Sequence, residues 1–269
     1  MWRAGMHRID RCFHELRAAR QTALIPYVTA GDPDLAVTRE LAWAFEGAGA
    51  DILELGVPFS DPLADGSTIQ RASQRALERG VTLKGVIGSV EQIRARSQMP
   101  IVLMSYMNPI LRMGLDEFAR RAKDAGVDGV IVPDLPPEEA GELRRCCAAT
   151  NVSTIFLAAP TSTDARLRRI AEASEGYIYY VSLKGVTGAR ESLQADLAVS
   201  LGRLRRLTNK PVAVGFGIST PAQAAEVARV ADGVIVGSAI VERIERGGGG
   251  QRAVEDAAGF VRILKEAMA

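Results

Sequence analysis

The sequence contains few residues of the types that support metal or thiol chemistry. Its 269 residues include two histidines, His7 and His14, and both lie near the N-terminus, away from the other candidate functional residues. The three cysteines are odd in number and show no metal-ligand spacing, which is typical of free thiols in a reducing compartment. We therefore expect neither histidine acid–base chemistry nor a bound metal.

Long hydrophobic runs and an excess of charge of one sign are also missing. The apolar runs are far shorter than the roughly 18 residues of a membrane span, and no apolar stretch follows the basic N-terminus as in a signal peptide. Lys and Arg number 33 against 32 Asp and Glu, and a net charge of +1 gives no general attraction to nucleic acid or membranes. With 47% hydrophobic residues, we expect a soluble, cytoplasmic protein with a large core.

Short apolar runs alternate with helical segments along the chain. Eight runs rich in β-branched residues begin at Ala23, Asp51, Ile101, Gly129, Ser153, Tyr177, Val212 and Gly233. Their nearly continuous apolar character is typical of parallel strands buried on both faces. Eight strand–helix repeats in about 250 residues predict a (β/α)8 barrel. An open doubly wound sheet is the alternative, and it is disfavoured because no GxGxxG motif follows the first strand.

Two further helices are expected outside the repeat. One is an N-terminal helix over Met6–Arg17, and the other is a short helix near Thr68–Leu77, in the long gap between the second and third strands. We expect residues 1–269 to form a single barrel domain, with residues 1–5 as a disordered tail.

Two carboxylates follow the second predicted strand. Alternation within Asp51–Gly56 points Glu54 into the barrel, while Asp65 lies in the polar loop beyond it. An isolated carboxylate in a sheet interior is costly, so the pKa of Glu54 is expected to rise toward the range of a general acid. Glu54 would then carry the proton and Asp65 would stay ionised, with Tyr179 beside them. A salt-bridged, structural Glu54 is the alternative.

Glycines close the seventh and eighth predicted strands. Gly217 and the pair Gly237-Ser238 each precede a helix-forming segment, and a phosphate site in these two loops recurs among (β/α)8 barrels. Free N–H groups at a helix N-terminus favour a dianion, and residues 184–188 after the sixth strand could add further donors. The alternative is that these glycines only make tight turns.

Four motifs together resemble the tryptophan synthase α subunit family. They are LELGVPFSDPLADGSTIQ at Leu53–Gln70, YVTAGDP at Tyr27–Pro33, SLKGVTGAR at Ser182–Arg190 and GFGIS at Gly215–Ser219. The resemblance spans essentially the whole chain from His7 onward. It implies a (β/α)8 barrel that cleaves indole-3-glycerol phosphate to indole and glyceraldehyde 3-phosphate by a retro-aldol reaction. It also implies an α2β2 complex in which the β subunit, and not this chain, carries pyridoxal phosphate.

The resemblance also implies roles for individual residues. Glu54 would be the general acid–base at the indole ring, Asp65 would accept a hydrogen bond from the indole N–H, and Tyr179 would pack against the reacting centre. The phosphate would bind at Gly185, Gly217, Gly237 and Ser238, with Thr187 in a loop that closes over the substrate, and Tyr27, Met104 and Ile131 would line the indole pocket. The surface facing the β subunit would include Asp61, Pro62, Asn108, Asp134 and Pro136.

Two features leave questions that the resemblance does not answer. Leu183-Lys184 stands where other family members often have an arginine or a small polar residue, which bears on closure of that loop, and the Gly247–Gly250 run predicts a surface turn. An uncoupled lyase, a related phosphate-binding isomerase and a non-catalytic regulatory subunit are the alternative functions. The acid pair disfavours the regulatory subunit, and the isomerase would more plausibly use a Cys/Asp or two-Asp pair, which is not found here.

Overall fold

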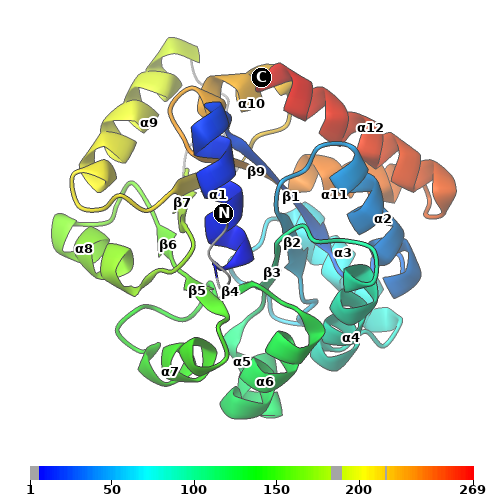
Figure 1. Ribbon diagram of the computed structural model, residues 1–269. Helices are drawn as coiled ribbons and strands as arrows, with labels where there is room; N and C mark the ends of the chain where they lie inside the picture. Colours follow the sequence, from blue (N-terminus) through cyan, green and yellow to red (C-terminus); the bar gives the residue numbers. More distant parts are fainter. Residues whose placement is uncertain (1–5, 183–189, 216) are drawn as a thin grey trace.

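Parallel strands alternate with helices, as the repeating pattern predicts (Figure 1). The computed structural model describes residues 6–182, 190–215 and 217–269, with only the backbone described over 190–196. The strands are β1 Ala23–Thr29, β2 Leu53–Gly56, β3 Ile101–Met104, β4 Gly129–Ile131, β5 Ser153–Ile155, β6 Leu157–Ala158, β7 Ile178–Val181, β8 Val212–Gly215 and β9 Gly233–Val236. The helices are α1 Arg8–Ala19, α2 Leu35–Gly47, α3 Ser67–Glu78, α4 Leu83–Arg94, α5 Met107–Met113, α6 Leu115–Ala125, α7 Gly141–Ala149, α8 Asp164–Ala173, α9 Arg190–Arg205, α10 Pro221–Ala228, α11 Ser238–Arg246 and α12 Gln251–Ala267.

The strands form one parallel sheet that closes into the predicted barrel. Their order is β5-β4-β3-β2-β1-β9-β8-β7-β6, so that β5 and β6 lie at the two ends of the sheet. These two strands are consecutive pieces of one segment, split at Phe156, whose backbone N–H donates to the Ser174 hydroxyl at 3.3 Å. Because β5 pairs with β4 and β6 pairs with β7, the split strand closes the ring. The expected fifth strand is therefore present as two short strands.

Side chains of alternate strand residues fill the barrel interior. The interior cluster contains Ala23, Ile25, Ile52, Val102, Ile131, Ile155, Tyr177, Ala213 and Ile235, together with three residues of α1, Ile9, Phe13 and Leu16. The intervening residues of each strand pack outward against the surrounding helices in a second, larger cluster. This two-sided burial is the reason that the strands have continuous apolar sequences.

Helix α1 covers the N-terminal end of the barrel. Figure 1 shows it lying across the ring of strands, and the Phe13 ring lies 5.7 Å from that of Tyr177 inside the barrel. The helix begins two residues later than expected because the Nδ1 atom of His7 caps it by accepting a hydrogen bond from the Ile9 N–H at 3.3 Å. The N-terminal helix is therefore confirmed as a plug over this end of the barrel.

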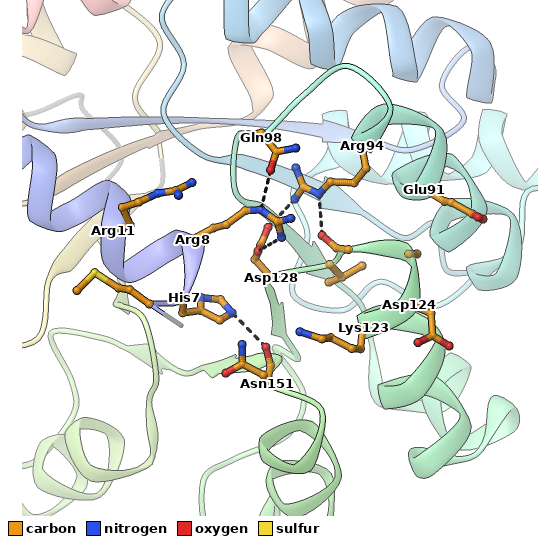
Figure 2. Close-up of a pocket in the computed structure, with 14 residues that line it drawn as sticks. His7, Arg8, Arg11, Glu91, Arg94, Gln98, Lys123, Asp124, Asp128 and Asn151 are labelled. Atoms are coloured by element: carbon orange, nitrogen blue, oxygen red, sulfur yellow. Dashed lines mark hydrogen bonds and ion pairs between the residues drawn. The ribbon is translucent and has the colours of Figure 1, made fainter. Parts of the chain in front are cut away.

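A buried aspartate fastens α1 to the barrel. Asp128 is 2% exposed and accepts hydrogen bonds from Arg8 of α1 at 3.0 Å and from the Ile101 N–H at 2.9 Å. Arg94, at the end of α4, pairs with Oδ2, the same oxygen that accepts from the Ile101 N–H (Figure 2). One carboxylate therefore joins α1, α4 and β3.

The short helix expected after the second strand is α3, and it begins directly after the loop that contains Asp65. The glycine run lies in the turn between α11 and α12, where three consecutive glycines, residues 248–250, have φ between 67° and 82°. That conformation favours glycine over other residues. No helix in the described ranges is both long and apolar enough to cross a membrane.

Candidate active site

A cavity of about 460 Å³ opens at the C-terminal ends of the strands. It is lined by Tyr27, Ala64, Asp65, Gly66, Ser67, Thr68, Ile69, Met104, Pro133, Leu157, Tyr179, Val181, Gly217, Ile218, Ser219, Ile235, Gly237, Ser238, Ala239 and Glu242. One side contains the Asp65 loop and the start of α3, and another contains the turns after β8 and β9. This is the end of a (β/α)8 barrel at which active sites form.

Glu54 lies fully buried on β2, beside the cavity-lining Tyr27 of β1 in the strand register. Its Oε1 atom accepts a hydrogen bond from the Tyr177 hydroxyl at 2.8 Å, whereas Oε2 has no partner among the described residues. Burial raises the pKa of Glu54 to about 8, and the hydrogen bond from Tyr177 limits that rise. No cation pairs with this carboxyl in the described part of the chain, so the salt-bridged alternative finds no support. Glu54 is therefore a buried acid that is protonated near neutral pH.

Asp65 lies at the mouth of the same cavity. Its loop is held in place by three hydrogen bonds: the Asp65 N–H to the Pro62 carbonyl at 3.0 Å, the Gln70 side chain to the Asp65 carbonyl at 2.8 Å, and the Ala64 N–H to the Tyr106 hydroxyl at 2.9 Å. Partial burial raises the pKa of Asp65 to about 6, and the nearby Tyr106 hydroxyl opposes that rise. Asp65 is the more readily ionised of the two carboxyls.

The rings of two tyrosines, Tyr27 and Tyr179, line the cavity near these acids. Each ring packs closely against a glycine. A Cβ atom on Gly56 would lie 2.0 Å from the Tyr27 hydroxyl oxygen, and one on Gly215 would lie 2.4 Å from that of Tyr179. Since such distances are impossible for real atoms, the glycines at the ends of β2 and β8 make room for the rings. Tyr27, Tyr179 and Met104 line this cavity.

The turns after β8 and β9 line the end of the cavity at which the sequence predicts an anion site. Gly217 has a φ of 74°, and both Gly217 and the Gly237-Ser238 pair line the cavity. Helix α11 begins at Ser238, and no side-chain hydrogen bond caps its N-terminus in the described structure. Its first N–H groups therefore point to the cavity without partners in the helix, an arrangement that favours a phosphate group.

The remaining residues of interest occupy other positions. Ile131 is fully buried in the barrel interior and does not line the cavity, and Gly185 and Thr187 lie outside the described residues. The residues expected to face a partner lie at the surface: Asp61, Asn108 and Asp134 are exposed, and Pro62 and Pro136 are half-buried. Asp134 accepts a hydrogen bond from the Met107 N–H at 3.0 Å.

Sequence reasoning missed two residues that support the two acids, Tyr177 and Tyr106, and one contact at the cavity rim, between Thr68 and Glu242. The Tyr177 hydroxyl donates to Glu54, and strand alternation, which places Tyr177 on the same side of its strand as Tyr179, is the signal that could have paired it with Glu54. Tyr106 holds the Asp65 loop from another strand end, and Thr68 donates to Glu242 at 3.2 Å across the cavity rim. Within the described residues, no group of His, Cys, Asp or Glu side chains is arranged to hold a metal ion.

A buried acid and an ionisable partner beside one cavity at the C-terminal ends of the strands are typical of a (β/α)8 barrel enzyme. Residues 13–269 match the family model for the tryptophan synthase alpha chain. The chain belongs to this family.

Known proteins of this family are similar to the chain over nearly its full length. The tryptophan synthase alpha chain of Geobacter sulfurreducens is 51% identical over 263 residues, covering 98% of this chain and 99% of the relative, and that of Chloroflexus aurantiacus is 51% identical over 265 residues with the same coverage. The crystal structure of the alpha subunit from Legionella pneumophila superposes with a TM-score of 0.90 at 38% identity, covering 98% of this chain and 99% of that one.

Proposed function

We propose that Glu54 and Asp65 perform the reaction of this family, the cleavage of indole-3-glycerol phosphate to indole and glyceraldehyde 3-phosphate. The chain is a carbon–carbon lyase of tryptophan biosynthesis. The observation that supports these roles best is the Oε2 atom of Glu54, a buried carboxyl oxygen without a protein partner beside the cavity wall. Leaving such an atom unpaired is costly, so its retention favours a role toward the substrate.

In the proposed mechanism, the protonated Glu54 donates its proton to the indole carbon that bears the glycerol phosphate chain. Positive charge then develops on the ring nitrogen, and the Asp65 carboxylate stabilises it by accepting a hydrogen bond from the N–H. The carbon–carbon bond breaks as the adjacent hydroxyl becomes the aldehyde, and the Glu54 carboxylate takes up the hydroxyl proton. The proton balance closes, and the ring is released as indole.

The phosphate would bind at the N-terminus of α11, held by Gly217, Gly237 and Ser238. Gly185 and Thr187 would complete this site from the loop after β7, and Tyr27, Met104 and Tyr179 would enclose the ring. As a member of this family, the chain is an alpha subunit with a β partner. We further propose an α2β2 assembly whose β subunit carries pyridoxal phosphate, a cytoplasmic location, and a single barrel domain over residues 1–269.

The substitution Glu54→Gln tests the proposal. It keeps the shape and the uncharged state of the buried group but replaces the acidic O–H by an amide that does not transfer a proton. Indole release should therefore fall by roughly 10²–10⁴. Asp65→Asn should also be severe, because a neutral amide does not balance charge on the ring nitrogen. Glu91→Gln, an exposed change on α4, is the control and should retain wild-type turnover. The proposal is wrong if Glu54→Gln releases indole at the wild-type rate.

A further inference from the structure

An ion-pair network joins α3 to α11 behind the cavity. Arg75 of α3 binds Asp32 through two hydrogen bonds, at 2.8 Å from Nε and 2.7 Å from Nη2, and its Nη1 atom reaches Glu245 of α11 at 2.7 Å. Asp32 follows β1 and is only 4% exposed. Arg71, one turn earlier on α3, also contacts Glu245, at 3.1 Å, but does not reach Asp32. We name Asp32, Arg75 and Glu245 the rear clamp.

The two joined helices bear the two ends of the active site. Helix α3 begins two residues after Asp65, and helix α11 begins at Ser238, at the end of the cavity where the anion site is predicted. At 1.5 Å per residue, Arg75 lies about 12 Å along α3 from its start, and Glu245 lies about 10 Å along α11. Both helices thus lead away from the cavity like two arms, and the Arg75–Glu245 ion pair joins them about 10–12 Å from their starts.

The two helices also meet through apolar side chains and through the bond from Thr68 to Glu242 near the cavity. Their contact includes a small cluster of Ile69 and Ala72 from α3 and Val241 from α11, together with Tyr27. Apolar burial is non-directional, so these apolar contacts constrain the relative direction of the helices less than an oriented ion pair does. The fork of Arg75, by contrast, is fixed by the buried Asp32 and presents its remaining nitrogen to Glu245 in one direction.

We propose that the rear clamp sets the separation between Asp65 and the phosphate end of the cavity, so that Arg75 and Glu245 act as positioning residues that select the length of the substrate. The inference rests on the proposed function, in which Asp65 holds the ring and α11 holds the phosphate. Both ends of a substrate bind productively only when the distance between them matches its chain, and a misplacement of about 1 Å can cost up to about 10² in rate.

The substitution Glu245→Gln tests the clamp, because it leaves the buried Asp32–Arg75 pair intact and removes both ion pairs between Glu245 and α3. Arg71→Gln is the matched control: it removes the other ion pair of Glu245 and leaves the Arg75 link in place. Arg75→Lys is a second variant, since lysine keeps the charge opposite Asp32 but does not span both partners. Thermal unfolding of each variant checks that the fold is retained.

Two readouts separate positioning from a general loss of structure. The first is steady-state cleavage, in which Glu245→Gln should lower kcat about tenfold while KM changes less than about threefold, because each substrate end keeps its own donors. The second is calorimetric binding of indole-ethanol, indole-propanol and indole-butanol phosphates, which differ by one methylene. The wild type and Arg71→Gln should share one preferred length, and Glu245→Gln and Arg75→Lys should bind the three within about threefold of one another.

The proposal is overturned if Glu245→Gln retains both the wild-type kcat and the wild-type length preference, or if Arg71→Gln changes them equally. A wild-type protein that cleaves no indole-3-glycerol phosphate would contradict the proposed function instead. The three-ligand binding series would then still decide whether the clamp selects length.

Discussion

At Glu54, two opposing interactions set the proton affinity of the carboxyl. Burial raises its pKa to about 8, while the hydroxyl of Tyr177 stabilises the ionised form. Asp65 has its pKa raised to about 6, again by burial. The proposed mechanism needs Glu54 protonated and Asp65 ionised. Below about pH 6 Asp65 takes up a proton, and above about pH 8 Glu54 loses one, so kcat/KM should be highest between these values.

Replacing Tyr177 by Phe should move one side of this pH profile. The lost hydroxyl no longer stabilises the Glu54 carboxylate, so the pKa of Glu54 rises further and the fall in kcat/KM at alkaline pH shifts upward. The rise in kcat/KM near pH 6, which follows the ionisation of Asp65, should not shift. Tyr180→Phe, on the outward face of the same strand, is the control and should leave both limbs unchanged. An unshifted alkaline limb in Tyr177→Phe would show that another group governs it.

The sequence predicts the position of some single side chains and not the contacts of others. The burial of Glu54 could be predicted because the alternation of β2 assigns its face from neighbours two residues away. The bond from Tyr177 depends on how β2 and β7 lie across the barrel, which is a property of closure rather than of either strand. Tyr106 likewise holds the Asp65 loop from a different repeat. Contacts between repeats are what local patterns do not reveal.

Among the elements, most strands and helices follow from periodicity, and the differences have local causes. The fifth strand divides at Phe156 because the Ser174 hydroxyl takes the backbone N–H that would otherwise continue the ladder. Helix α1 starts at Arg8 because His7 caps it through a ring nitrogen, which common capping patterns do not include. Neither difference moves the cavity.

Substitution of Asp128 by Asn should weaken the attachment of α1 and α4 to β3 and so lower the stability of the fold. The change removes the carboxylate that pairs with Arg8 and with Arg94, whose side chain is only 10% exposed. The buried Arg94 then keeps its bonds to backbone carbonyls but has no anionic partner. We expect the free energy of unfolding to fall by about 3–5 kcal/mol in urea denaturation. Asp124→Asn, at an exposed position in the same surface cleft (Figure 2), should change it by less than about 0.5 kcal/mol. An equal fall in the free energy of unfolding in both variants would show that the Asp128 ion pairs are not its specific cause.

The whole molecule has two different ends. The N-terminal end is sealed by α1, while the C-terminal end bears the cavity and two large apolar side chains at the surface, Leu63 at 95% exposure and Leu111 at 54%. Leu63 lies in the Asp65 loop, and Leu111 lies on α5 near Asn108. Such exposed side chains beside expected interface residues fit the proposed β subunit surface.

Leu63→Asp should weaken the complex with a purified β subunit by at least about tenfold, because a charge would replace an apolar anchor at the proposed interface. Ile263→Asp on α12, which is 52% exposed and on a different surface, is the matched control and should bind as the wild type does. Calorimetry gives the affinity, and indole release with and without β gives the activation. Wild-type affinity in Leu63→Asp would move the interface elsewhere, and a chain fully active without β would favour the uncoupled lyase.

The position of α1 has a consequence for how the protein is made. The ribosome synthesises this helix before every strand that it covers, yet its apolar side chains Ile9, Phe13 and Leu16 pack against residues as late as Ile235 of β9. At 5–20 residues per second, the roughly 220 residues between them take about 10 to 45 seconds to emerge. Throughout that time the helix has no complete surface to cover it. The apolar face of α1 therefore stays exposed on the nascent chain until the barrel is nearly complete, and it closes the end opposite the catalytic cavity last.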